Sequence, residues 1–477
     1  MKRIKILLIL SLSLSLFSCS DDFLGKDSRD NVSGDQIIDL ANSSPEAAFT
    51  ITSGMESGNN IFVNDFNTAG NGNIHDDFGY MAINLGLDLM SNDMVQYQSH
   101  WFVNYYNYTA RNEISIRTDM VWKFYYKVIY NMNSILKFLP ENINNDELRY
   151  LKARCLAMRG LSYFNLVRLY ANGEVGIPMY TETVLDASRV PTSTIVALIE
   201  DDLTTAHQLI DGYSRPTKVN IDKNVVAGFL ARYYLEYGDY SQAATYAAEA
   251  RSGYLPMNNL FDGFNKISNS EWMWGADINT NTSTYYASYF SHVGNLNAGY
   301  AGLLGIYKNI DKRLYDNIPS TDQRKDWFDG PSYGLPQYAN VKYYDDTDFE
   351  GDYVFMRAAE MYLIEAEAKA LNGDDLGARQ ALFDLISTRD ASYTLSSNSG
   401  SALLSEIRLH RRIELWGEGF ALYDMKRWGV DLERNYAGSN HTSFGFFNYP
   451  AGSVKFTFQI PLSEINANPA LGSQNPF

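Results

Sequence analysis

The sequence DKNVVAGFLARYYLEYGDYSQAATYAAEAR occupies residues 222–251 and indicates the fold class of the chain. It predicts two short helices joined by a tight turn, because small and apolar residues recur at helical spacing on both sides of Gly238-Asp239. The recurring residues are Leu230, Ala231 and Tyr234 in the first helix and Ala243, Ala247 and Ala250 in the second. One such hairpin cannot bury its own apolar face, so we expect the rest of the chain to supply neighbours.

Small residues at these positions let two antiparallel helices approach closely, which is typical of a tetratricopeptide repeat. Helical periodicity also covers residues 119–139, 145–169 and 191–210, and a second hairpin begins after 353 with its turn at Gly373-Asp374. The two turns are not a whole number of repeats apart, since this repeat is about 34 residues long. We predict a mostly α-helical chain with interrupted tetratricopeptide-like repeats at about 119–251 and 353–428 and a few short strands, one of them at 271–274.

Two long segments, at about 58–111 and 255–350, lack helical periodicity and are rich in Asn, Gly and aromatic residues. Irregular segments of this length inside a compact protein are usually functional. Ser44-Pro45-Glu46 provides an N-cap, a proline at the first helical position and an acidic first turn, which predicts a helix to about residue 57. We expect residues 44–477 to form a single composite domain whose loop-rich part binds the ligand.

The first 43 residues are predicted to direct and tether the protein. Lys2, Arg3 and Lys5 precede an apolar run too short to span a bilayer, so residues 1–18 are expected to be a secretory signal peptide. The run ends in LFSC, which resembles a bacterial lipobox and predicts lipidation of Cys19. Residues 19–43 would then be the lipidated N-terminus and tether, and Cys155 would have no disulfide partner.

The formal charge of the 477-residue chain is −17, which disfavours nucleic acid and anionic membrane surfaces as partners. The chain contains 35 Tyr, 25 Phe and 7 Trp. These rings suit either a core or a binding surface, because Tyr and Trp combine a rigid apolar face with a polar tip.

A sugar ring needs a flat aromatic face to stack on and amides or carboxylates to hydrogen-bond its hydroxyl groups. Aromatic residues of the two irregular segments are therefore candidate ligand-binding residues, whereas Trp272 and Trp274 are assigned to the core. Trp101 and Asn104 would lie on one side of a local helix, with Asp77 in the same segment. A second candidate set is Tyr285, Tyr286 and Tyr289 beside Asn295 and Asn297, and a third is Trp327 with Tyr333. Packing within the loops is the alternative for each of these residues.

Three motifs resemble the SusD/RagB family of surface glycan-binding lipoproteins. The most specific is IRLHRRIELWGEGFALYDMKRWG at residues 407–429, with His410 where the family commonly has an acid. RAAEMYLIEA at 357–366 and FQIPLSEIN at 458–466, followed by Gln474-Asn475-Pro476, are the other two. The resemblance covers nearly the whole chain from Cys19 onward, whereas the two irregular segments resemble nothing in particular.

The resemblance implies a non-catalytic, lipid-anchored protein on the cell-surface side of the outer membrane. It implies that the chain captures an oligosaccharide in its loops and passes it to a SusC-like TonB-dependent transporter. A peptide-binding RagB-like import lipoprotein is an alternative, and a secreted glycoside hydrolase is a further one. A hydrolase would need two opposed carboxylates about 5 to 10 Å apart.

No pattern in the sequence indicates an enzyme or a cofactor. The six histidines are scattered singly, and neither G-x-S-x-G nor a glycine-rich phosphate loop is present. Arg411, Arg412 and Arg427 can pair with Glu414, Glu418 and Asp424, and such pairing lowers carboxyl pKa values, which argues against a catalytic Glu418/Asp424 pair. The acidic run at 345–352 could bind a cation, but a solvated loop is the expectation.

Overall fold

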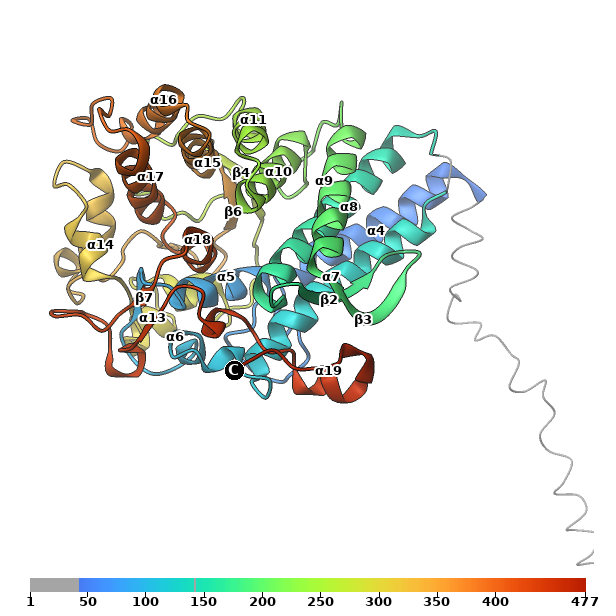
Figure 1. Ribbon diagram of the computed structural model, residues 1–477, viewed down its shortest axis with the longest axis horizontal. Coiled ribbons are helices and arrows are strands. Elements are labelled where there is room, and N and C mark those ends of the chain that lie inside the picture. The colour runs from blue at the N-terminus through green and yellow to red at the C-terminus, as the bar shows by residue number, and fades with distance from the viewer. Residues whose placement is uncertain (1–42, 141–142) are drawn as a thin grey trace, which may run out of the picture.

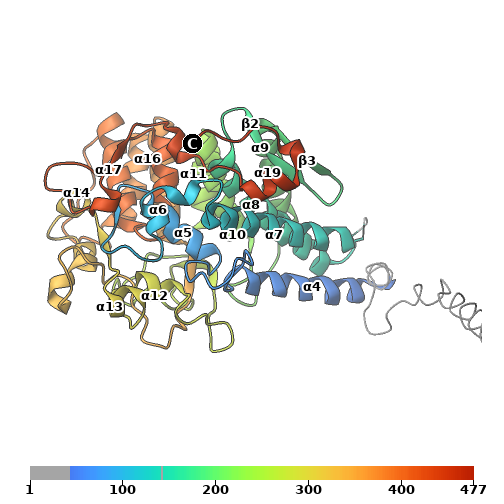
Figure 2. The same ribbon diagram turned by 90° about the horizontal axis from the view of Figure 1, so that it is seen from below.

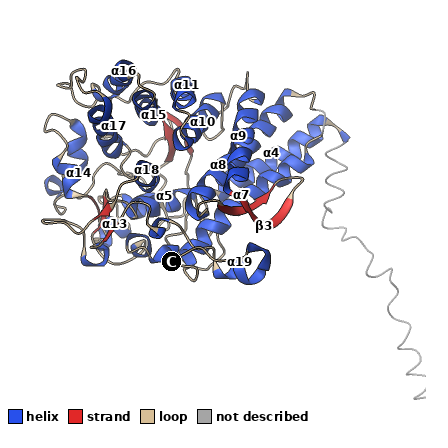
Figure 3. Cartoon of the chain, viewed as in Figure 1, coloured by secondary structure: helices blue, strands red, loops and turns tan. Residues whose placement is uncertain are grey.

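The computed structural model describes residues 43–140 and 143–477, so the predicted signal peptide, Cys19 and most of the predicted tether lie outside the described residues. Helices dominate the described chain, and its strands are few and short (Figure 3). The prediction of a mostly α-helical fold is confirmed.

The predicted hairpin at 222–251 forms as α10 (Lys223–Tyr237) and α11 (Tyr240–Ala250). Gly238 ends α10 in the left-handed conformation, with φ at 88°, and the Asp239 side chain caps α11 by accepting from the Gln242 amide. Ala243, Ala247 and Ala250 are fully buried, as their spacing predicted. The local sequence therefore determines both the turn and the face that packs.

Neighbouring helices extend this hairpin in both directions (Figure 1). On one side lie α4 (Pro45–Phe62), α7 (Ile116–Phe138), α8 (Asp146–Tyr170) and α9 (Thr192–Leu209), and on the other lie α15 (Ala358–Leu371), α16 (Asp375–Ile386) and α17 (Gly400–Glu414). Helix α11 packs directly against α15 although about a hundred residues separate them in sequence. The repeats are thus interrupted in sequence but continuous in space.

The segment between α11 and α15 leaves the helical array and returns to it. Strand β4 (Trp272–Ala276) pairs antiparallel with β6 (Tyr353–Arg357), which closes the segment where it begins and ends. Between these strands lie α12 (Tyr289–Val293), α13 (Tyr300–Leu304), β5 (Lys308–Ile310), α14 (Lys312–Asp316), η3 (Gln323–Phe328) and η4 (Gly330–Tyr333). Trp272 and Trp274 of β4 are buried, as expected from the sequence.

The remaining elements lie against the helical array and the inserted segment (Figure 2). Strand β1 (Met94–Gln96) pairs with β5, β2 (Val175–Tyr180) with β3 (Leu185–Pro191), and β7 (Leu432–Glu433) with β8 (Asn448–Tyr449). The helices are α5 (Tyr80–Leu89), α6 (Val103–Tyr106), η2 (Thr109–Arg111), α18 (Ala421–Trp428), η5 (Ser443–Gly445), η6 (Val454–Phe456), α19 (Leu462–Ala467) and η7 (Pro469–Leu471).

Residues 58–111 were expected to be loop throughout, but they contain helix α5. All of its residues except Tyr80 are buried, including the polar Asn84 and Asp88, so it lacks the exposed polar face by which a surface helix is detected. It begins after Gly79, where φ is 77° and a β-carbon would lie 2.2 Å from the Val63 carbonyl oxygen. Only glycine fits this close approach.

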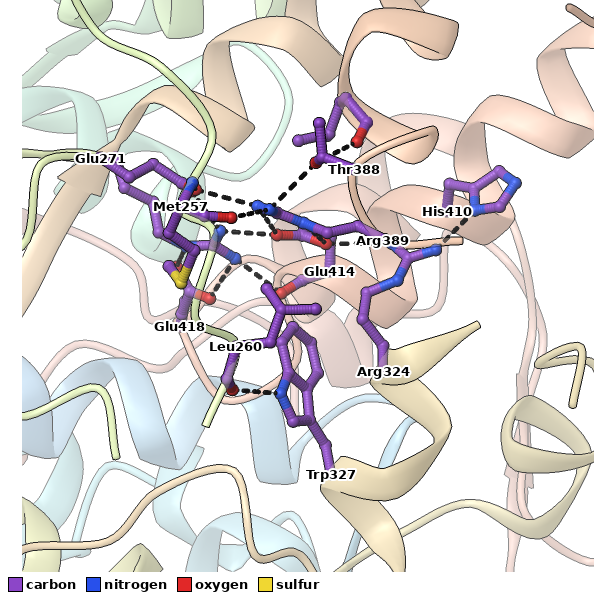
Figure 4. A network of polar contacts seen from close by, with 12 residues as sticks. Met257, Leu260, Glu271, Arg324, Trp327, Thr388, Arg389, His410, Glu414 and Glu418 are labelled. Carbon is purple, nitrogen blue, oxygen red and sulfur yellow. Dashed lines mark hydrogen bonds and ion pairs between the residues drawn. The ribbon is translucent and has the colours of Figure 1, made fainter. Parts of the chain in front are cut away.

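A buried ion-pair network joins the inserted segment to α17 (Figure 4). Arg357 binds Glu271, Glu414 and Glu418 at 2.7–2.8 Å, and Arg389 binds Glu271 and Glu414 at 2.9 Å. Two basic groups of the insert complete it: Arg324 lies 3.0 Å from Glu414, and Lys342 lies 2.9 Å from Glu418. We call these seven residues the buried ion-pair network.

The network corrects the pairings proposed from the sequence. Arg411 and Arg427 do contact Asp424, at 2.7 and 3.0 Å, but Arg412 binds Asp93, and Glu414 and Glu418 take their cations from distant segments. Burial alone would raise the pKa of Glu418, but the charges of Arg357 and Lys342 outweigh burial and lower it. Glu418 is therefore an ionised structural group, as the arginine-rich motif suggested.

Candidate functional site

Strand pairing brings the two irregular segments of the chain together. Gln96 of β1 lies opposite Lys308 of β5, so the loop after β1 meets the loop and helix before β5. The Gln96 amide also donates to the backbone oxygens of Gln98 and Trp101, at 3.1 and 3.0 Å, which fixes the loop that carries Trp101. Residues far apart in sequence thereby reach one surface.

Five rings meet on this surface, and we call them the aromatic site: His75, His100, Trp101, Tyr286 and Tyr300. Tyr300 lies at their centre, with ring centroids 5.4 Å from His100, 5.6 Å from His75, 6.2 Å from Tyr286 and 6.3 Å from Trp101. His75 stacks on Trp101 at 5.7 Å with an interplanar angle of 8°. The cluster is a mixed aromatic surface built from both loop segments.

Hydrogen bonds hold the inner rings of the aromatic site in place. The Tyr300 hydroxyl and His75 Nδ1 are 2.8 Å apart, and the buried His292 ring stacks beneath Tyr300 at 4.8 Å. His292 Nε2 donates to the His75 backbone oxygen at 2.7 Å. The outer rings are accessible, because Tyr286 is 50 % exposed, His100 is exposed and Trp101 is half-buried.

The backbone around the aromatic site is strained. Phe102, Tyr285 and Phe349 all have left-handed φ values, of 70°, 51° and 63°, which non-glycine residues rarely adopt. Such strain costs about 1–3 kcal/mol per residue and persists only where the surroundings enforce it. Here Ser283 accepts from the Tyr285 amide at 3.2 Å and donates to the Phe349 carbonyl at 2.7 Å, while Phe349 packs on Tyr286 at 5.5 Å.

Two of the predicted sets of ligand residues thus contribute to one site. Trp101 and Tyr286 were proposed in separate sets, and Tyr300 joins them. Tyr285 is 55 % exposed beside Tyr286 and remains a candidate contact. Asn104 does not lie beside Trp101 on a helix, because left-handed Phe102 separates Trp101 from α6, and the Asn104 amide donates instead to Thr109 at 3.0 Å.

Other predicted residues are buried and support the loops from within. Asp77 is 1 % exposed and accepts from Thr68 at 2.7 Å and from the Ala69 amide at 3.1 Å. The Tyr289 hydroxyl donates to the Gly417 carbonyl at 2.6 Å. Asn295 exchanges two hydrogen bonds with the Lys308 backbone, and Asn297 likewise binds the Asp345 backbone.

The third predicted set, Trp327 with Tyr333, does not form a surface lip. Trp327 is fully buried and donates from Nε1 to the Leu260 carbonyl at 2.8 Å, so its placement at the surface is corrected. Tyr333 is 57 % exposed at the end of η4, and no ring contact of the described chain joins it to the aromatic site.

His75, His100 and Tyr300 were not selected from the sequence. Histidines scattered singly gave no signal, yet three of the six (His75, His100 and His292) contact Tyr300. The β1–β5 pairing brings the two segments together, and neither segment shows a strand pattern of its own. Within the described ranges, no group of three His, Cys, Asp or Glu side chains is placed to hold a metal ion, and no helix is long and apolar enough to span a bilayer.

A stacked helical array with an aromatic site built from its loops defines a class of helical-repeat protein that presents a surface site. Residues 219–477 match the model of the SusD family, and residues 77–235 match a model described as "Starch-binding associating with outer membrane". The chain belongs to the SusD family.

Relatives of known sequence or structure agree with this assignment. A SusD-like protein, P25 of Formosa agariphila, is 24 % identical over 440 residues, covering 77 % of this chain and 81 % of its own. A SusD-like carbohydrate-binding protein from Bacteroides vulgatus has a TM-score of 0.75 and 27 % identity, with 89 % of this chain and 97 % of its own covered. Surface glycan-binding protein A from Bacteroides uniformis has a TM-score of 0.67 and 17 % identity, with coverage of 83 % and 94 %, and shows the same fold.

Proposed function

We propose that this protein captures an oligosaccharide at the aromatic site without cleaving it. The observation that carries the proposal is the convergence of Trp101, Tyr286 and Tyr300 from two loop segments on one accessible surface. Flat rings at different angles suit the C–H faces of successive sugar units. The SusD-like relative from Bacteroides vulgatus, which is described as carbohydrate-binding, supports the same ligand class.

The proposal extends to transport. The resemblance to the SusD/RagB family implies that a lipid-anchored binder passes its ligand to a SusC-like TonB-dependent transporter in the outer membrane. Lipidation of Cys19 would supply the anchor. Anchoring beside a transporter raises the effective concentration of ligand at the pore, so weak binding of each sugar suffices. Recovery of a TonB-dependent transporter with this protein from detergent-solubilised outer membranes tests the partnership, and Cys19→Ser tests the anchor.

Binding to a panel of glycans, measured by calorimetry, tests capture. Trp101→Ala and Tyr286→Ala should each weaken binding by about 0.5–1.5 kcal/mol, or roughly two- to tenfold, because each removes a stacking face. Tyr333→Ala is the control, since it removes a ring about as exposed as that of Tyr286 but outside the aromatic site. Equal losses in all three variants would contradict the assignment of the site.

Two further outcomes separate the alternatives. Release of reducing sugar from any bound glycan would support a hydrolase, whereas binding without turnover supports capture. Binding of a protein digest in place of glycans would support the peptide-binding alternative.

A further inference from the structure

Lys308 is a buried cation with no counter-ion among the described residues. Its side chain is fully buried in β5, and within the part of the chain that the structure describes, Nζ donates only to the backbone carbonyl of Ile306, at 3.1 Å. No carboxylate of the described chain lies within ion-pair distance of it, whereas the equally buried Lys342 has Glu418 at 2.9 Å. Burial lowers the pKa of Lys308 to about 7. A buried charge without a partner is unfavourable for folding, so such groups often mark functional sites.

Lys308 lies next to the aromatic site. Its strand partner is Gln96, whose amide holds the Trp101 backbone. Its charge acts on two histidines around Tyr300: after burial, Lys308 is the main cause that lowers the pKa of His100 and that of the buried His292. The nearby acid Asp76 is already bound by Arg117 at 2.9 Å. Because Arg117 already pairs with Asp76, this carboxylate is not free to neutralise Lys308 or His100.

The opposite end of the aromatic site has the opposite charge. Phe349, which packs on Tyr286 at 5.5 Å, belongs to a segment that contains Asp346, Asp348 and Glu350. Asp346 and Asp348 are exposed, and none of the three acids has an ion-pair partner in the described chain. The site is thus acidic near Tyr286 and carries histidine and lysine near Trp101.

We propose that the oligosaccharide carries an anionic group, a uronate carboxylate or a sulfate ester, which binds at the Trp101–His100 end of the aromatic site. The inference rests on the proposed function of glycan capture. Lys308 supplies the favourable charge for this group, and the exposed His100 ring supplies a hydrogen-bond donor. Neutral units then occupy the Tyr286 end, because the acidic segment there repels an anion.

The proposal implies that binding takes up a proton. An anion near Lys308 raises the pKa of its amine, which is only partly protonated at neutral pH in the free protein. The bound state therefore holds more protons than the free state at and above about pH 7. Affinity for a charged glycan should fall as pH rises, by up to about tenfold per pH unit, whereas affinity for a neutral glycan should not.

The experiment compares oligogalacturonides, which carry carboxylates, and carrageenan oligosaccharides, which carry sulfates, with neutral laminarin and xylan oligosaccharides. Calorimetry in two buffers of different ionisation enthalpy measures both affinity and proton uptake. We expect wild-type protein to bind a charged probe with proton uptake. Lys308→Met should lose the uptake and the pH dependence yet unfold at a higher temperature, because an apolar side chain replaces a buried charge.

Two surface variants provide an independent check. His100→Gln should weaken binding of the charged probe several-fold, while Asp348→Asn, at the acidic end, should leave it unchanged or tighter. Binding of neutral probes alone would overturn the inference and leave glycan capture standing. Binding of none of the four probes would count against capture as well, and unchanged proton uptake in Lys308→Met would overturn the role of Lys308.

Discussion

At the scale of single residues, the aromatic site is held in shape by backbone strain. Tyr285 has a left-handed φ of 51°, and Ser283 holds it there through bonds to Tyr285 and Phe349. The strained conformation fixes the exposed Tyr285 ring beside Tyr286 before ligand binds. Because this ring is already ordered, less conformational entropy is lost on binding.

Tyr285→Gly should therefore separate stability from binding. Glycine adopts this φ without strain, so the free energy of unfolding should rise by about 1 kcal/mol while glycan affinity falls. Chemical denaturation and calorimetry measure the two effects. Tyr285→Ala is the matched control: it loses the ring but keeps the strain, so affinity should fall without a gain in stability. Equal stability of the two variants would show that the strain is negligible.

Candidate site residues could be chosen from the sequence by residue type and segment, but whether each one is exposed or buried depends on packing. Trp101 and Tyr286 were selected because they are aromatic residues in irregular segments, and both reach the aromatic site. Trp327 and Tyr289 satisfied the same criterion but are buried, because an aromatic residue in a loop can equally well anchor that loop. Tyr300 could not be paired with Trp101 without the β1–β5 contact, because the two residues belong to different segments.

At the scale of elements, one carboxylate links the repeat helix α15 to α18. Glu367 is buried and accepts from Arg427 at 2.8 and 2.9 Å and from Trp428 at 2.7 Å. Burial would raise its pKa, but Arg427 and its neighbours outweigh burial and lower the pKa to about 2. The link therefore depends on the ionised form.

Acid should weaken this link in a defined range. Because the folded pKa lies below the unfolded value of 4.5, the contribution is complete above about pH 4.5 and is lost as pH falls toward 2. The shift corresponds to roughly 3 kcal/mol. Glu367→Gln should lower stability at neutral pH and flatten its dependence between about pH 4.5 and 2, as measured by urea unfolding. A wild-type slope in the variant would contradict the assignment.

Helices were predicted reliably when one face is buried. The repeats at 222–251 and 353–386 follow their apolar periodicity, and their caps lie at the expected Gly and Asp residues. Helix α5 shows no such contrast, since neighbours surround it, and the short strands β1 and β5 were not visible for lack of length. Burial by residues distant in sequence explains the omission of α5, and shortness explains that of the two strands.

At the scale of the whole molecule, the buried ion-pair network ties the inserted segment to the helical array. Glu414 contacts three arginines, Arg324, Arg357 and Arg389, and none of these side chains is exposed to solvent. Loss of one partner would leave charges buried without compensation, which costs about 3–5 kcal/mol.

Glu414→Gln should therefore be strongly destabilising, by about 3–5 kcal/mol in guanidinium unfolding. Glu433→Gln is the control, because Glu433 pairs with Arg313 at the exposed surface, where such a pair contributes about 0–1 kcal/mol. Similar losses in the two variants would show that the network adds little to stability.

The antiparallel pairing of β4 with β6 also bears on how such proteins diversify. Since Ala276 and Tyr353 are register partners, a foreign segment of another length could be spliced between them without moving the helices that flank the junction. Contacts between the segment and the rest of the chain limit the exchange: Arg324 and Lys342 neutralise glutamates outside it, and β5 pairs with β1. A recipient chimera that retains equivalents of these two cations and of the strand that pairs with β1 should fold. Its glycan preference should change mainly at the Tyr286 end of the aromatic site, because Tyr286 and Tyr300 come from the exchanged segment whereas Trp101 and His100 do not.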